Sequence, residues 1–84
     1  MSEDEVRNRT RAFLEPQLNG RLLADSDDLF ATGYVNSLFA MQLARFVQRD
    51  LGIKLTSYDM NLDNFRSVDG IVRLARSKAS PGAQ

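Results

Sequence analysis

Three segments of the chain carry apolar residues at intervals of three and four, the spacing that places side chains on one face of an α-helix. The stripes consist of Val6, Thr10, Phe13 and Leu14; of Phe39, Leu43, Phe46 and Val47, widened by Ala40, Ala44 and Leu51; and of Val68, Ile71, Val72, Leu74 and Ala75. Helices with one apolar face bury that face against one another. The pattern therefore predicts an all-α fold, a small bundle of three main helices.

Capping and breaking residues define the first of these helices. Ser2 and Glu5 have the spacing of a capping box, which predicts a helix that begins immediately after Ser2. Pro16 lacks a backbone N–H, so this helix is expected to end or kink within residues 14–18. The turn is expected at Asn19 and Gly20.

The other two helices have similar signals. The second is expected to begin at Asn36 or Ser37 and to end near residue 50, before Gly52. Ser67 is the expected N-cap of the last helix, which should run to about residue 77. Residues 63–65 are expected to form a short helical turn ahead of it.

A long connection, residues 21–36, joins the first two helices and contains its own apolar residues. They are Leu22, Leu23, Leu29, Phe30, Tyr34 and Val35, and they predict that the loop is ordered. Residues 27–30 are expected to form one helical turn that places Leu29 and Phe30 in the core. Asp25, Asp27 and Asp28 lack the spacing of a calcium-binding loop, so they predict a solvated, helix-capping acidic turn and no metal site.

Length and composition exclude several classes of protein. Eighty-four residues suffice for one small domain, expected over residues 1–77, with a small, polar and disordered tail over residues 78–84. With no Cys and no His, the chain lacks the parts for a thiolate zinc site, a disulfide framework or histidine acid–base catalysis. Eleven basic and eleven acidic residues balance, which does not favour nucleic-acid binding. Neither a signal peptide nor a run of membrane-spanning length is present, so we expect a cytoplasmic monomer with no membrane partner.

Ser37 is the side chain at which covalent chemistry is best placed. A Ser at a helix start is most simply explained as an N-cap, although Asn36 can cap instead and leave the Ser37 hydroxyl facing outward. A phosphodiester on Ser37 would lie at the positive end of the helix dipole, a favourable anion site. Since the chain offers no base to activate the hydroxyl, it is expected to be a substrate of another enzyme and not itself an enzyme.

Leu38, Met41 and Arg45 follow Ser37 at helical spacing but lie off the core stripe. Together with Asn36 and Gln42 they form a candidate docking surface for partner proteins. The alternative is that Leu38 packs under the long loop and Met41 is half-buried.

The stretch Asp28-Leu29-Phe30-x-x-Gly33-x-x-Asn36-Ser37-Leu38 resembles the 4′-phosphopantetheine attachment motif of acyl carrier proteins. The resemblance extends over nearly the whole chain, from the first helix to Asn64-Phe65-Arg66-Ser67-Val68 ahead of the last. It implies that a phosphopantetheinyl transferase attaches the 4′-phosphopantetheine cofactor, taken from coenzyme A, to Ser37. Acyl groups would then be carried as thioesters on the thiol of that arm.

Residues 33–43 most resemble the discrete carriers that assemble methoxymalonyl extender units for polyketide antibiotic biosynthesis. The implied partners are a glyceryl-loading enzyme, tailoring dehydrogenases, a methyltransferase and a polyketide synthase. Two departures argue against fatty-acid synthesis: Asn36 replaces the usual Asp, and the second helix presents Gln42, Arg45, Gln48 and Arg49 where many fatty-acid carriers have Glu. A D-alanyl or other specialised carrier is one alternative. An unmodified helical protein-interaction module, in which Ser37 is only a cap, is the alternative of another class.

Overall fold

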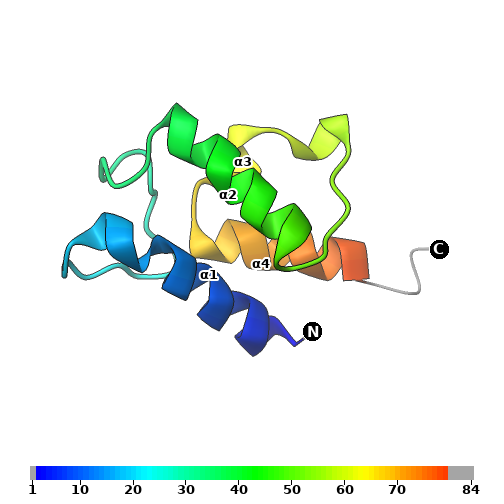
Figure 1. Ribbon diagram of the computed structural model, residues 1–84, viewed down its shortest axis with the longest axis horizontal. Helices are drawn as coiled ribbons and strands as arrows, with labels where there is room; N and C mark the ends of the chain where they lie inside the picture. The colour runs from blue at the N-terminus through cyan, green and yellow to red at the C-terminus, as the bar shows by residue number, and fades with distance from the viewer. Residues whose placement is uncertain (1, 80–84) are drawn as a thin grey trace.

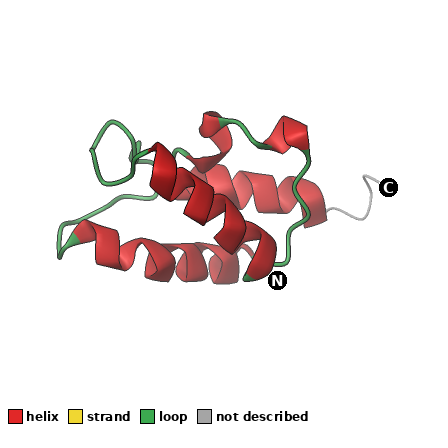
Figure 2. Ribbon diagram, turned by 45° about the horizontal axis from the view of Figure 1, so that its top comes forward, coloured by secondary structure: helices red, strands yellow, loops and turns green. Residues whose placement is uncertain are grey.

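A computed structural model describes residues 2–79, and this part of the chain is helical with no strand (Figure 2). The elements are α1 (Glu3–Leu18), α2 (Ser37–Arg49), a 3-10 turn η1 (Ser57–Asp59), α3 (Leu62–Phe65) and α4 (Val68–Ala79). The prediction of an all-α bundle with three main helices is confirmed.

Helices α1 and α4 pack along each other in opposite directions, and α2 lies across them (Figure 1). The short α3 packs against both α2 and α4. Phe13 of α1 stacks on Phe46 of α2, with ring centroids 4.4 Å apart, and lies 5.5 Å from the ring of Phe39. These contacts join α1 to α2, and the predicted stripes meet in one core.

The predicted helix ends are confirmed at both termini of α1. Glu5 N donates to Ser2 Oγ at 3.1 Å, which completes the N-cap. Pro16 lies inside the last turn, and the helix ends two residues later at Leu18. Asn19 follows in the left-handed region with φ of 52°, a conformation that Asn tolerates better than most residues.

Helix α4 begins as predicted but extends further than expected. Ser67 Oγ accepts a hydrogen bond from Gly70 N at 3.0 Å, so Ser67 caps the helix. The helix continues to Ala79, two residues past the expected end. Lys78, assigned by the sequence to a disordered tail, is therefore helical, and its Nζ pairs with Asp59 at 2.6 Å. The rest of that predicted tail, residues 80–84, lies outside the described residues.

The turn η1 was not expected from the sequence. Thr56 N donates to Asp59 Oδ2 at 2.8 Å, and Asp59 N donates back to Thr56 O at 3.0 Å. This reciprocal pairing closes the turn between α2 and α3. The Thr-x-x-Asp spacing of residues 56–59 was the available signal, but a single turn has no apolar periodicity to reveal it.

Candidate functional site

Ser37 is the first residue of α2, and Asn36, not Ser37, is its N-cap. Phe39 N donates to Asn36 Oδ1 at 2.9 Å, and Ala40 N donates to Asn36 O at the same distance. Ser37 is exposed, and its hydroxyl has no hydrogen-bond partner within residues 2–79. The sequence left open whether Ser37 or Asn36 caps this helix. The structure assigns the cap to Asn36, and the Ser37 hydroxyl is free for another role.

The first turn of α2 also retains donors of its own. Within the described residues, the backbone N–H groups of Ser37 and Leu38 donate no hydrogen bond. No acidic residue lies in this turn. An anionic group on Ser37 Oγ would therefore meet free donors and the positive end of the helix dipole.

The long first loop holds the start of α2 in place through backbone contacts with the α3–α4 junction. Leu29 N donates to Arg66 O at 2.7 Å, and Val35 N donates to Leu29 O at 3.2 Å. Both Leu29 and Val35 are buried in the core. Because Val35 immediately precedes the cap residue, the anchored loop fixes where α2 begins. The prediction of an ordered loop is confirmed.

Two local predictions about this loop require correction. The helical turn expected at residues 27–30 lies slightly further along the chain: Thr32 N donates to Asp28 O at 3.0 Å and closes one turn over residues 28–32, and Asp28 Oδ1 caps this turn by accepting from Phe30 N and Ala31 N. Leu29 is buried as expected, but Phe30 is only half-buried. Leu22, predicted as an anchor, is 93% exposed, since the neighbouring Leu23 takes the buried position.

Asp25 ties the same loop to α1 and α4. Its carboxylate accepts from Arg7 at 2.8 Å and from Arg11, while Arg7 also donates to Asp69 at 2.8 Å. Asp69 N donates to Asp25 O at 3.0 Å. Partial burial raises the pKa of the Asp25 carboxyl, but the two arginine hydrogen bonds outweigh it and hold that pKa below its usual range.

The acidic loop residues thus have structural partners. Asp27 Oδ2 accepts from Ala24 N at 2.9 Å, and Asp28 caps its own turn. The sequence predicts a solvated, helix-capping acidic turn, which Asp28 confirms in its capping, but it does not identify Asp25 as an ion-pair partner of α1. The signal that was available is the series Arg7, Arg9 and Arg11, of which Arg7 and Arg11 lie one turn apart on a helix.

The predicted docking residues lie on the outer side of α2. Leu38 is 67% exposed and Met41 is 66% exposed, and Asn36, Gln42 and Arg45 are exposed as well. The alternative that Leu38 packs under the loop and that Met41 is half-buried is wrong. Two further exposed apolar side chains are Met60, which lies just before α3, and Leu62, the first residue of α3.

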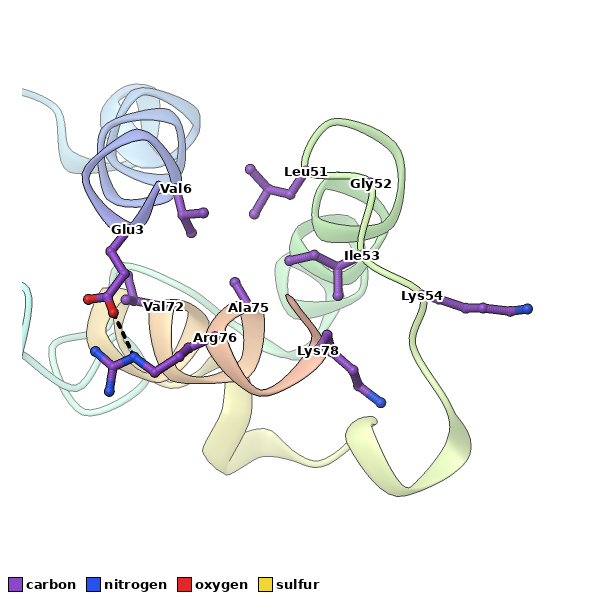
Figure 3. A pocket seen from close by; sticks show the side chains of 10 residues that line it. All are labelled: Glu3, Val6, Leu51, Gly52, Ile53, Lys54, Val72, Ala75, Arg76 and Lys78. Atoms are coloured by element: carbon purple, nitrogen blue, oxygen red, sulfur yellow. Dashed lines mark hydrogen bonds and ion pairs between the residues drawn. The ribbon is translucent and has the colours of Figure 1, made fainter. Parts of the chain in front are cut away.

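A mostly apolar cleft lies at the other end of α2 from Ser37. It has a volume of about 590 Å³ and opens between the first turns of α1, the second half of α4 and residues 51–54. Figure 3 shows Val6, Leu51, Ile53 and Ala75 directed into the cleft, the Glu3–Arg76 ion pair at its edge, and Lys54 directed away from it. Because α2 is about 20 Å long, the cleft does not enclose the serine.

Few groups surround the Ser37 hydroxyl in the part of the chain that the structure describes. Within residues 2–79 no side chain hydrogen-bonds the hydroxyl, so nothing is in position to take its proton. Ser37 is not among the residues that line the three best-defined clefts of residues 2–79. Ser37 thus presents an exposed hydroxyl at the start of α2.

Comparisons of the chain with protein-family models and with curated proteins gave no match. Within the described part of the chain, every helix is too short or too polar to cross a bilayer.

Proposed function

We propose that this chain is an acyl carrier protein that bears a 4′-phosphopantetheine arm on Ser37. The supporting observation is that Asn36 and Ser37 differ in their roles at the start of α2. Asn36 caps α2, and the exposed Ser37 hydroxyl is left without a partner among the described residues. A serine that served only the helix would be expected to accept a hydrogen bond from the first turn.

The covalent step belongs to a phosphopantetheinyl transferase. Ser37 Oγ forms a phosphodiester with the phosphopantetheine phosphate of coenzyme A, the phosphoanhydride bond of coenzyme A breaks, and the nucleotide bisphosphate leaves. The hydroxyl proton goes to the transferase, since this site provides no base. The phosphodiester anion then lies beside the free N–H groups of Ser37 and Leu38 at the helix N-terminus.

For the cargo we propose a glyceryl-derived methoxymalonyl extender unit for polyketide biosynthesis, on the resemblance of residues 33–43. The partners would be the loading enzyme, tailoring dehydrogenases, a methyltransferase and a polyketide synthase. A D-alanyl or other specialised carrier is the alternative. Neighbouring genes distinguish the two: a glyceryl-loading enzyme with two dehydrogenases and an O-methyltransferase supports the first, and a D-alanine-activating enzyme the second.

Intact-mass spectrometry tests the carrier function. Incubation with coenzyme A and a broad-specificity phosphopantetheinyl transferase should add the mass of one phosphopantetheine unit. Ser37→Ala should abolish the gain, and Ser26→Ala, a matched change at an exposed serine of the first loop, should leave it intact. Circular dichroism checks that both variants keep their helices. No mass gain on the folded parent chain would contradict the proposal.

The proposal of another class is an unmodified helical interaction module. The observation in its favour is that Leu38 and Met41 are exposed, because these side chains can contact a partner without any modification of Ser37. The Ser37→Ala variant separates the two proposals. The interaction module would be favoured if two results were found together: the parent chain carries no modification in cells, and Ser37→Ala keeps all partner binding there.

A further inference from the structure

The outer face of α2 combines apolar and cationic side chains in one line. Leu38, Met41, Arg45 and Arg49 recur at intervals of three and four, so they share one helix face over about 16 Å. All four are exposed. The buried residues of the helix, Ala40, Leu43, Ala44, Phe46 and Val47, lie on the opposite side.

The charge on this face is of one sign. Helix α2 contains no acidic residue between Ser37 and Arg49. Neither Arg45 nor Arg49 forms an ion pair within residues 2–79, whereas five other arginines of the chain do so. These two guanidinium groups are thus available to an outside carboxylate, although the chain as a whole has no net charge.

We infer that this face docks a partner protein whose own surface presents an apolar contact flanked by carboxylates. Leu38 and Met41, beside Ser37, supply the apolar anchors, and Arg45 and Arg49 supply two cations further along the helix. Bidentate pairing with carboxylates sets the register of the helix on its partner. The inference rests on the proposed function, because it names the chemistry of the partners that meet the Ser37 arm.

A protein is favoured over a phosphate polymer or a lipid surface by the composition of the face. Two arginines in one line are few for a polyanion site, which gains its affinity from many cations. Half of the line is apolar, and Leu38 and Met41 lie closest to the modified serine. An apolar anchor with a charged flank is the usual anatomy of a specific protein interface.

Two synthetic helical peptides provide the probes. They share the same apolar face and differ only in their flanks, one carrying Glu and the other Lys. Each is titrated into the isotope-labelled full chain, without the arm, and chemical-shift changes locate the contact. We expect the Glu peptide to shift Leu38, Met41, Arg45 and Arg49 and to bind about fivefold or more tightly than the Lys peptide at low salt. Raising the salt concentration should narrow this difference.

Variants test the residues individually. The double substitution Arg45→Glu and Arg49→Glu should reverse the peptide preference, and Arg73→Glu on α4, exposed and unpaired within the described residues, should leave it unchanged. Leu38→Ala should weaken both peptides, and Leu22→Ala, at another exposed leucine, should weaken neither. All of these positions are exposed, so the variants should remain folded.

Several outcomes overturn the inference: equal affinity for the two peptides, preference for the Lys peptide, shifts confined to another surface, or no binding of either. Binding of phosphatidylglycerol vesicles at the same residues without a preference for the Glu peptide would overturn it in favour of a membrane. The peptide assay does not use Ser37. A mass gain without a peptide preference therefore leaves the carrier function standing, and a preference without a mass gain rejects only the carrier.

Discussion

Asn36 Oδ1 accepts a hydrogen bond from Phe39 N at 2.9 Å, so Asn36 and not Ser37 is the N-cap of α2. The two residues are adjacent in sequence and are both favoured at helix starts, so the sequence leaves the assignment open. The structure assigns the cap to the first of them. Measurements of the free energy of unfolding can therefore separate the contributions of the two side chains.

Asn36→Ala should lower the free energy of unfolding by about 1 kcal/mol, because the Phe39 N–H loses its acceptor. Ser37→Ala should change it by less than about 0.5 kcal/mol, as is usual for an exposed position without a structural role. Urea unfolding followed by circular dichroism measures both. If the two variants lose equal stability, Ser37 shares the cap.

Asn36→Asp is the matched control for this pair. A carboxylate can accept the same hydrogen bond and adds a negative charge near the positive end of the α2 dipole. Its stability at pH 7 should equal or exceed that of the parent chain. The variant also introduces the Asp that the acyl carrier motif usually has at this position.

The helices were predictable from sequence because each depends on a repeated signal. Apolar spacing defined the three stripes, and Ser2, Pro16 and Ser67 defined where helices begin or end. Single turns have weaker signals: the turn expected at residues 63–65 is present as α3 (Leu62–Phe65), whereas η1 was not expected. The turn η1 depends on one reciprocal contact between Thr56 and Asp59, and a contact of that kind leaves no periodic pattern.

Gly70→Ala should destabilise the protein although alanine is the better helix former. A methyl group at position 70 would meet the backbone oxygens of Asp63 and Asn64, both at 3.1 Å, where α3 approaches the start of α4. The gain in helix propensity is about 1 kcal/mol, and overpacking against backbone costs about 1–3 kcal/mol. The sequence alone does not reveal this close approach, because α3 and position 70 meet only through tertiary packing.

Thermal unfolding of Gly70→Ala measures the net effect. Arg73→Ala in the same helix is the control, since Arg73 is exposed and its change to alanine alters helix propensity only slightly. A higher melting temperature for Gly70→Ala would show that α3 moves away at little cost. The expected result is a lower one.

Leu29 and Leu22 form a matched pair in the first loop. Leu29 is fully buried, and Leu22 is 93% exposed. Leu29→Ala should cost about 2–5 kcal/mol, a large share of the stability of so small a domain, whereas Leu22→Ala should stay within about 0.5 kcal/mol. Urea titration compares them. Equal losses would mean that the loop is not anchored through Leu29.

The candidate site around Ser37 was only partly predictable from sequence, because some of the contacts that position it join residues far apart in the chain. The sequence placed Ser37, Leu38, Met41 and Arg45 at the start and on the outer face of a helix, because helical spacing decides which residues share a face. It did not show that Asp25 joins the loop to two helices. Arg7 and Asp69 are 62 residues apart, and Asp25 is 18 residues from Arg7. Only the folded chain brings the three together.

The Asp25 cluster should make stability depend on acidity. The pKa of Asp25 lies below its ordinary value of 3.8 in the folded chain, because hydrogen bonds from Arg7 and Arg11 outweigh the effect of burial. A carboxyl whose pKa is lowered by folding adds stability that is fully present above its unfolded pKa and is lost as the pH falls through the folded pKa. Its contribution should therefore be constant from about pH 5 to pH 7 and decline below about pH 4.

Asp25→Asn isolates that contribution. The variant should be less stable than the parent chain at pH 7, because Arg7 and Arg11 lose their shared anion. The difference should shrink below pH 4, where the parent carboxyl is itself becoming protonated. Urea midpoints at pH 7, 5 and 3 measure this trend.

Asp63→Asn is the control: Asp63 is 84% exposed and its ion pair with Arg66 spans 3.6 Å, so its removal should have little effect at any pH. A difference between Asp25→Asn and the parent chain that stays constant down to pH 3 would show that the Asp25 carboxylate is not stabilised by its arginines.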